Sequence, residues 1–174
     1  QAGDGQMCDA VIDRGTLLAI MQAAKKADDS LLRDYAETTV AVADIKIAVR
    51  SMKTGKNKDF MKRAMAECNT LDIDRLATAA VAGMEEIERY LADTAYAGGA
   101  EALSKSASAF ERWCDNRIIE TIKPQKYNPF TVGPIVAYIL ARLNEIKTVR
   151  IILTCKLNQL PEEAIRERVR EMYV

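Results

Sequence analysis

A long apolar segment near the carboxyl end constrains the fold more than any other feature of this sequence. Residues 133–157, GPIVAYILARLNEIKTVRIILTCKL, are apolar enough to resemble a membrane helix, yet five charged side chains lie between positions 142 and 156. A spanning helix needs about 20 residues almost free of charge, and a charge at its centre costs roughly 2.5 to 3.5 kcal/mol. We therefore expect no transmembrane segment and a long helix buried in protein.

The residue inventory excludes several classes of function. Lys and Arg number 25, as do Asp and Glu, so the basic excess typical of nucleic-acid binding is missing. The chain has no histidine and its four cysteines lack C-x-x-C spacing, so we expect no metal site and no cofactor. The cysteines are expected to be free, buried thiols. The amino terminus lacks a signal peptide and an initiator Met, and we interpret it as the cut edge of a longer chain.

Helical periodicity and strong helix formers dominate the whole chain, so we expect an all-α protein. Asp13 is a plausible N-cap for the first helix, residues 28–30 break the chain, and Gly55 suits a left-handed helix end. The helices are expected at residues 13–27, 31–53, 59–67, 75–81, 84–91, 100–105, 106–122 and 133–157, and from about 160 through the arginines at 166, 168 and 170.

An internal repeat emerges when the chain is compared with itself at an offset of 104 positions. This offset pairs the helix expected at 31–53 with the one at 133–157, each preceded by a shorter helix and a break. Apolar matches between two helices are weak evidence, because both share one period. The pairing of Lys46 with Arg150 is more telling, since each cation lies in a row of apolar side chains.

A cation in an apolar row needs either a carboxylate partner or a wet cavity. One interpretation is therefore an internal ion pair, with Asp72, Asp74 or Glu111 as the acid. The other is that Lys46 and Arg150 line a socket that grips another protein. Both interpretations treat the helix at 133–157 as a central strut surrounded on most sides.

Motifs of catalysis are missing from the sequence. There is no phosphate-binding loop, no dinucleotide fingerprint, no H-E-x-x-H, and no histidine to activate a nucleophile. TGKNK at 54–58 superficially resembles a phosphate loop, but it lacks the first glycine and a preceding strand. The adjacent acids at 85–86 and 162–163 fall in first helical turns, where the helix dipole favours them. We expect no catalytic residues.

The carboxyl third of the chain resembles the C subunit of the V-type (archaeal and bacterial) rotary ATPase, a relative of the eukaryotic d subunit. The similarity covers residues 127–174 through an Asn-Pro-Phe run at 128–130, Gly-Pro at 133–134, Arg150 with its following aliphatic residues, and the Tyr-Val ending. TLDIDRL and MEEIERYLADTAYAG resemble the segment just upstream, and the region from GDGQMCDA to Arg50 resembles the middle repeat. The resemblance spans essentially the whole chain.

The resemblance implies a particular domain organisation. Members of the family contain three related helical units arranged as a funnel. Residues 1–66 would then be part of the middle unit, truncated at its start, and residues 67–174 the carboxyl-terminal unit. Apolar side chains near residues 7–20 would be left exposed or paired with another copy.

The resemblance also implies a function. The family caps the membrane proteolipid ring on its cytoplasmic side and seats the central shaft, so torque passes through it during proton or sodium ion transport, and it catalyses nothing. By this resemblance the partners are the proteolipid ring and the shaft subunits. The protein would be peripheral at the cytoplasmic face of the membrane, and this fragment alone would be soluble. The alternative is a helical-repeat adaptor unrelated to ATPases, which the repeat alone supports equally.

Overall fold

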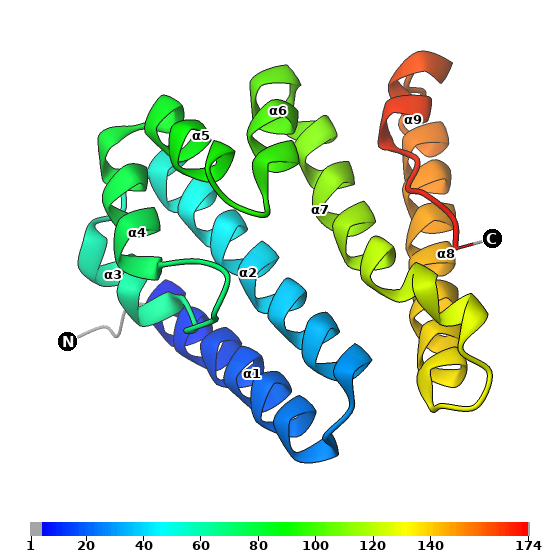
Figure 1. Ribbon diagram of the computed structural model, residues 1–174. Coiled ribbons are helices and arrows are strands. Elements are labelled where there is room, and N and C mark those ends of the chain that lie inside the picture. Colours follow the sequence, from blue (N-terminus) through cyan, green and yellow to red (C-terminus); the bar gives the residue numbers. More distant parts are fainter. Residues whose placement is uncertain (1–4, 174) are drawn as a thin grey trace. The chain divides into compact units, whose positions relative to one another are not determined.

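The computed structural model describes residues 5–173, which are largely helical (Figure 1). No strand occurs within this range, which confirms the expectation of an all-α protein. Expectations that concern residues 1–4 or Val174 lie outside it. In chain order the elements are α1 (Gly5–Ala27), α2 (Ser30–Lys53), α3 (Lys58–Ala64), α4 (Ile73–Ala82), α5 (Met84–Ala92), α6 (Ala97–Lys105), α7 (Ala107–Ile122), the 3₁₀ helix η1 (Lys123–Tyr127), α8 (Gly133–Leu157) and α9 (Glu162–Arg168).

The chain divides into two compact units, Gln1–Ala100 and Glu101–Val174. The first contains α1 to α5, the second contains α7 to α9, and α6 spans the division. This division follows the compactness of the folded chain, whereas the expected boundary between repeat units came from the resemblance to a family. The boundary expected between repeat units, with residues 1–66 on one side and 67–174 on the other, therefore stays a prediction.

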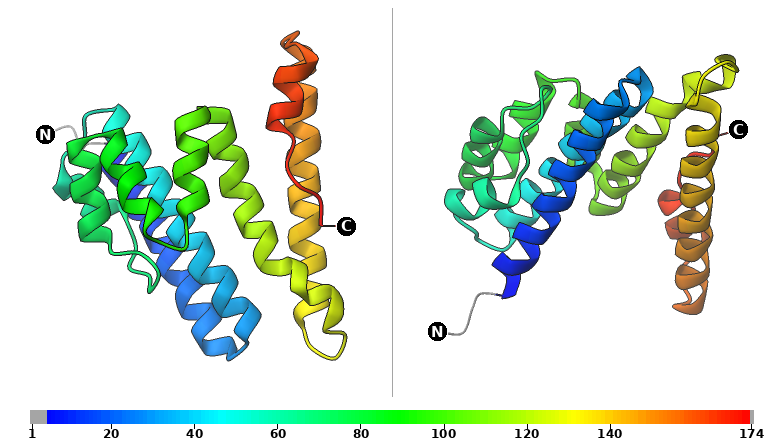
Figure 2. Two further views of the ribbon diagram at one scale, coloured as in Figure 1. Left: turned by 45° about the horizontal axis from the view of Figure 1, so that its top comes forward. Right: turned by 90° about the horizontal axis from the view of Figure 1, so that it is seen from below.

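In the first unit, α1 and α2 form a helical hairpin against which α3 packs, and α4 and α5 pack on α2 (Figures 1 and 2). The hairpin turns at Asp28, whose φ is 48°, and the Asp29 side chain accepts the Leu32 N–H at 3.1 Å to cap α2. The expected break at 28–30 is confirmed at Asp28 and Asp29, whereas Ser30 already begins α2. Fully buried side chains of this unit include Ile45, Met61, Met65, Leu76, Ile87 and Leu91.

In the second unit, α7 and α8 are joined by η1 and residues 128–132, and α9 contacts both of them (Figure 2). α7 ends at Ile122, and Pro124 lies in the first turn of η1, since proline cannot continue an α-helix. Pro134 lies in the first turn of α8, where its missing N–H costs no helical hydrogen bond. The buried apolar residues of the unit include Phe110, Cys114, Ile119, Ile122, Ala137 and Ile165.

The helix boundaries repeat at the expected offset. α3 (Lys58–Ala64) and α9 (Glu162–Arg168) have the same length and lie 104 residues apart. α2 ends at Lys53 and α8 ends at Leu157, again 104 residues apart. In both segments a long helix therefore follows a helical partner and leads through a short turn into a seven-residue helix.

The turn after each long helix repeats in backbone detail. Gly55 has a φ of 64°, which confirms the expected left-handed helix end, and its counterpart Gln159 has a φ of 56°. A hydrogen bond from the next residue's N–H back to a carbonyl of the last helical turn closes each one, as in a Schellman motif. These bonds are Lys56 to Ser51 at 2.9 Å and Leu160 to Cys155 at 3.0 Å.

Several helix ends differ from expectation: α3 ends at Ala64 rather than at residue 67, α6 begins at Ala97 rather than at residue 100, and α1 and α9 differ as follows. α1 begins at Gly5, so Asp13 lies inside the helix and is not its N-cap. No proline interrupts the eight residues before it, and a helix that is already nucleated extends through them. α9 ends at Arg168, so Arg170 lies beyond the helix. Arg170 is instead drawn into an ion pair with an acid of α7.

We predict opposite effects of Gly→Ala at two positions where an added Cβ meets no atom within 4 Å. Gly55→Ala should lower the free energy of unfolding by about 1 kcal/mol, because alanine is strained at positive φ. Gly15→Ala, inside α1, should raise it by about 1 kcal/mol through helix propensity. Urea unfolding followed by circular dichroism measures both, and two shifts of the same sign would contradict the left-handed assignment of Gly55.

Candidate functional site

Lys46 and Arg150, the two cations predicted from the repeat, belong to different compact units and differ in exposure. Lys46 is half-buried on α2, whereas Arg150 is exposed on α8. Among the described residues Arg150 has no ion-pair partner within 4 Å. It borders a shallow groove of about 380 Å³ whose other lining residues are Arg142, Glu145, Ile146 and Val149. The role of both cations as partner sockets stays a prediction.

Two of the three acids proposed as partners for these cations bind other groups of the first unit. Asp72 caps α4 by accepting the N–H groups of Asp74 and Arg75 at 2.9 and 3.0 Å. Asp74 pairs with Lys62 at 2.8 Å and with Lys58 at 3.9 Å. Both carboxylates lie at the amino-terminal end of α4, where the helix dipole favours negative charge.

The helix α8 is not the strut surrounded on most sides that its composition predicts. Its buried residues are only Gly133, Ala137, Asn144, Thr148 and Cys155. They recur every four or seven residues and are small or polar, so the neighbouring helices contact one narrow stripe of α8. Its large aliphatic side chains lie outside this stripe, with Leu143 58% and Leu157 84% exposed.

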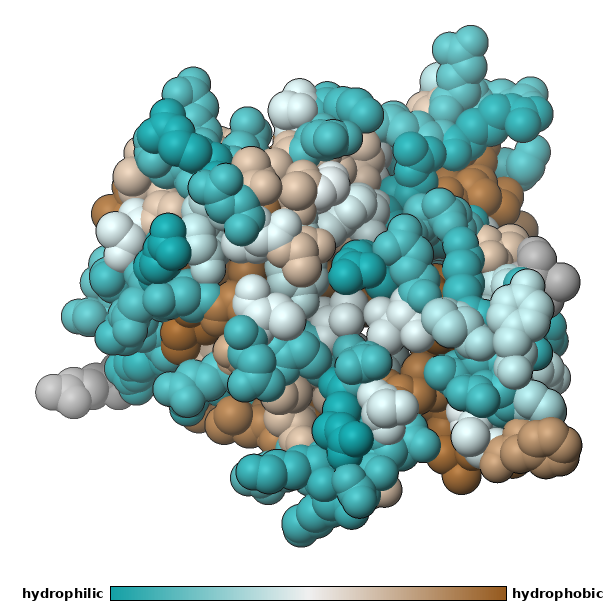
Figure 3. Space-filling model, in the orientation of Figure 1, coloured by the Kyte–Doolittle hydropathy of each residue, from teal (hydrophilic) through white to brown (hydrophobic). Residues whose placement is uncertain are grey.

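The exposed apolar side chains of α8 contribute to a mixed surface. Figure 3 shows apolar areas, in brown, emerging between hydrophilic side chains in the region of α8 and α9. A buried helix would need every charge matched inside the protein, whereas a helix with one covered stripe leaves most charges in water. The charges within this apolar segment are therefore tolerated because most of α8 is at the surface.

Three of the five charged side chains of α8 have identified partners in this unit. Arg142 pairs with Glu145 one turn along the same helix. Lys147 reaches across to α7 and donates to Asp115 Oδ1 at 2.6 Å. The ion pair that joins this helix to a buried acid is thus made by Lys147, whose own side chain is half exposed, and not by Arg150.

Asp115 of α7 is the centre of a buried charge cluster in the second unit. Its other oxygen, Oδ2, accepts a hydrogen bond from Arg170 Nε at 2.7 Å. The Asp115 and Arg170 side chains are only 9% and 7% exposed, while Lys147 is half exposed. Breaking a buried pair leaves an uncompensated charge, so this contact is costly to lose.

Arg170 belongs to a return segment, residues 169–173, that follows α9 back along α7 and α8. Glu171 is held from both helices: its N–H donates to Asn116 Oδ1 and its carbonyl accepts from Asn144 Nδ2, both at 2.9 Å. Its carboxylate pairs with Lys123 at 2.5 Å. The return segment is thereby fixed to both long helices by side-chain hydrogen bonds.

The first unit fastens its own return segment, residues 65–70, by similar means. Asp44 of α2 is fully buried, and its Oδ1 accepts the Ala66 N–H at 3.0 Å. Arg14 of α1 donates from Nε to the Met65 carbonyl at 2.7 Å. Asp44 Oδ2 is buried without a hydrogen-bond partner among the described residues. Burial raises the pKa of Asp44 to about 7, although the Ala66 hydrogen bond and the charge of Arg14 oppose the rise.

Glu37 of α2 holds the far end of the same return segment. Its Oε1 accepts the N–H groups of Asn69 and Thr70 at 2.6 and 2.7 Å. Cys68 lies between these contacts, and burial raises the pKa of its thiol to about 11. A thiol with such a pKa is protonated at neutral pH, so Cys68 is a structural residue rather than a nucleophile.

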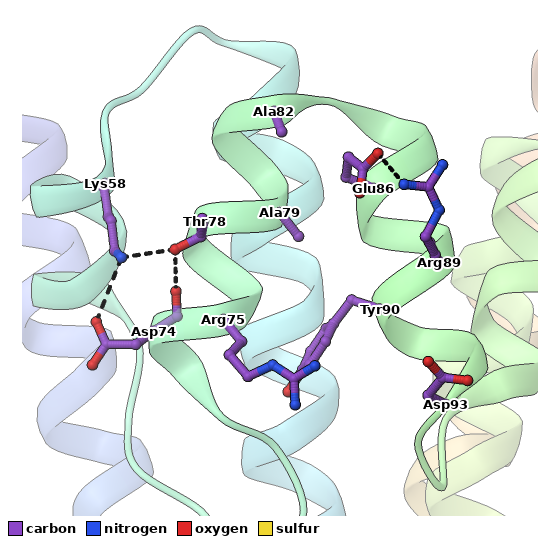
Figure 4. Close-up of a pocket in the computed structure, with 10 residues that line it drawn as sticks. All are labelled: Lys58, Asp74, Arg75, Thr78, Ala79, Ala82, Glu86, Arg89, Tyr90 and Asp93. Carbon is purple, nitrogen blue, oxygen red and sulfur yellow. Dashed lines mark hydrogen bonds and ion pairs between the residues drawn. The ribbon is translucent and has the colours of Figure 1, made fainter.

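A groove of about 460 Å³ lies between α4 and α5, with Lys58 of α3 at one side (Figure 4). Glu86 pairs with Arg89 at 2.5 Å, and the Arg75 guanidinium lies 5.3 Å from the centre of the Tyr90 ring. Lys58 donates to the Thr78 hydroxyl at 2.7 Å. The groove therefore presents neighbouring opposite charges rather than a field of one sign that would concentrate a charged substrate.

Residues 5–173 were compared with the patterns expected of a metal site, a membrane helix and a disulfide. Within that range no cluster of three or more His, Cys, Asp or Glu is arranged to hold a metal ion. No helix there combines the length and apolarity needed to cross a bilayer. The four cysteines form no disulfide in this part of the chain. Cys114 and Cys155 are buried as expected, whereas Cys8 is exposed, because α1 buries little of its surface.

Sequence reasoning missed Asp115 and Arg170. Asp115 shares a helical row with Ile119 and Ile122, both buried, and this placement of an acid among apolar residues was an available signal. Arg170 was expected to belong to the last helix, because it directly follows the charged run of α9. Its partner lies 55 positions away, and no local pattern specifies such a contact.

Comparison with known proteins identifies the family. The family model described as ATP synthase (C/AC39) subunit matches residues 1–168. The chain belongs to this family. The resemblance found in the sequence is thereby confirmed. The C/AC39 subunit is a non-catalytic subunit of the rotary complex.

A curated relative gives the extent of the match. The C subunit of the A-type ATP synthase of Methanocaldococcus jannaschii is 27% identical to this C/AC39 family member over 156 residues. The alignment covers 84% of this chain and 39% of the relative, so the chain spans about two fifths of that protein's length. No solved structure matches the chain.

We predict that the buried contact of Arg170 dominates the stability of the second unit. Arg170→Met should lower the free energy of unfolding by about 3 to 5 kcal/mol, because it leaves Asp115 buried with one half-exposed partner. Lys147→Met should cost about 1 kcal/mol or less. Arg166→Met, which removes an exposed contact with Glu162, is the control and should change it by less than about 0.5 kcal/mol. Equal effects of Arg170→Met and the control in urea unfolding would contradict the assignment.

We predict that Asp44 makes the first unit less stable as pH rises from about 4 to 7. Its pKa is raised in the folded state, so between these pH values the folded chain keeps a proton that the unfolded chain has released. The loss should be on the order of a few kcal/mol and should level off above pH 7. Asp44→Asn, which keeps the shape without titrating, should remove this part of the pH dependence in urea unfolding. Parallel pH profiles of the two proteins would be inconsistent with a raised pKa.

Proposed function

We propose that this chain is part of a non-catalytic central-stalk subunit that couples the rotating shaft of a V-type ATPase or ATP synthase to the membrane proteolipid ring. The observation that carries the proposal is the C/AC39 family match over residues 1–168. The similarity to the C subunit of an A-type ATP synthase agrees with it. The ion moved by the parent complex is a proton or a sodium ion.

The build of the two units supports a mechanical role. A piece that transmits torque must resist bending, and close-packed helices have the low compressibility of protein interiors. Each unit also fastens its return segment with a buried carboxylate, Asp44 in one and Asp115 in the other. Such contacts raise the cost of sliding one helix past its neighbour, because a slide would break hydrogen bonds in a dry interior.

The partners in this proposal are the proteolipid ring and the central shaft subunits. The protein works at the cytoplasmic face of the membrane as a peripheral component. Lys46 and Arg150, the cations at equivalent repeat positions, are proposed to contribute to sockets for these partners. Polar sockets hold a partner in register and set its specificity through complementary charge.

A helical-repeat adaptor is the second candidate. The repeated helix boundaries and turns support it as well as they support an ATPase subunit. The family match separates the two, because it concerns residues along the whole chain rather than a helical period.

Removal of the full-length subunit from the purified ATPase tests the proposal. Ion pumping driven by ATP should be lost, whereas ATP hydrolysis by the soluble catalytic sector should persist, because the link between shaft and ring is missing. Adding back the full-length subunit should restore pumping. Pumping that is unaffected by removal, or a full-length protein that never associates with the ATPase, would refute the coupling role.

A further inference from the structure

The outer face of α8 carries a row of large aliphatic side chains that the described residues leave exposed. Their exposed fractions range from 46% to 84%. Their spacing of three, four or seven residues, with Arg150 filling the longest interval, places them on one side of the helix. We call this set the outer row: Ile135, Ile139, Leu143, Ile146, Leu153 and Leu157.

The internal repeat indicates that this side of the helix is built for packing. At the 104-residue offset, Ile135, Ile146 and Leu153 correspond to three aliphatic residues of α2. Those counterparts are exposed by only 3% to 5% and are Leu31, Val42 and Val49. Half of this face is therefore buried in the sibling helix, where Tyr35 and Thr39 are half-buried and Lys53 is exposed, whereas the whole row is exposed in α8. An apolar strip of this length at the surface of a helical unit marks an interaction site.

Arg150 restricts what can cover the row. It lies between Ile146 and Leu153 and has no ion-pair partner among the described residues. Glu145 is the only acidic residue of α8, and Arg142 already binds it. A surface that excluded water from the row would leave the Arg150 charge buried and uncompensated unless it supplied an acid of its own.

We propose that the outer row docks an amphipathic α-helix of another subunit of the ATP synthase, with an Asp or Glu placed opposite Arg150. The inference rests on the proposed function, in which the chain works inside that complex. A helix fits because its side chains, also spaced by three and four residues, interdigitate with such a row. A second copy of α8 does not fit, since two such faces bring two arginines and no unengaged carboxylate.

Site-specific photo-crosslinking in the assembled complex tests the occupant. Leu153 is replaced by a photoreactive phenylalanine in the full-length subunit, the ATP synthase is purified and irradiated, and the linked peptide is sequenced. We expect a peptide from a different subunit, helical in pattern, with aliphatic residues every three or four positions and an acid among them. The control carries the probe at Val81 of α4, which is also exposed but lies outside the row. It should not label that peptide.

A charge swap tests the role of Arg150. Arg150→Glu should weaken retention of the full-length protein in the complex by about tenfold or more, because two acids would then face each other. Changing the acid of the cross-linked helix to Arg should restore retention. Arg166→Glu, which reverses an exposed cation outside the row, is the matched control and should change retention little. Unchanged circular dichroism of Arg150→Glu shows that the fold is kept.

Several outcomes would overturn the inference. They are a crosslink to a second copy, to lipid, or to another part of the same polypeptide, equal labelling at Val81, and normal retention of Arg150→Glu. The coupling role is tested separately. If ion pumping needs the protein but Leu153 crosslinks to none of its neighbours, this inference fails and the proposed function stands. If the protein never joins the ATPase, both fail.

Discussion

A buried carboxylate that fastens the chain after a short helix is the interaction on which each unit depends. Asp44 holds Ala66, and Asp115 holds Arg170. The two acids are not at equivalent repeat positions: one lies on the long helix itself, and the other lies on the helix that precedes it. Both units therefore fix the segment after the short helix to the helices beneath it, but they do so with acids at different positions.

Much of the fold follows from local chemistry. Asp29, Asn57 and Asp72 cap the helices that follow them, as acids and amides do at helix starts. Gly55 ends α2, because the backbone there takes a positive φ that glycine adopts readily. The start of α1 could not be predicted from the sequence, because no capping side chain marks it. The end of α9 could not be predicted either, because it depends on the ion pair of Arg170 with Asp115, which is far away in the sequence.

The site was less predictable than the fold. Periodicity identified the apolar rows and the cations within them, but it cannot say which row a neighbouring helix will cover. In α8 the covered stripe consists of small and polar residues such as Ala137 and Thr148, while the more hydrophobic row is left outside. Close approach of two helices selects for small side chains, so the most apolar side of a helix is not always the one its own unit buries.

The turn after each long helix has a broader consequence. One turn uses Gly55 and the other uses Gln159, yet the backbone follows the same path and closes with the same bond. The backbone path of this turn therefore does not require one particular amino acid. Further copies of this module in distant genomes would escape searches by residue identity, and the spacing from a long helix through a left-handed residue to a seven-residue helix would be the better tracer.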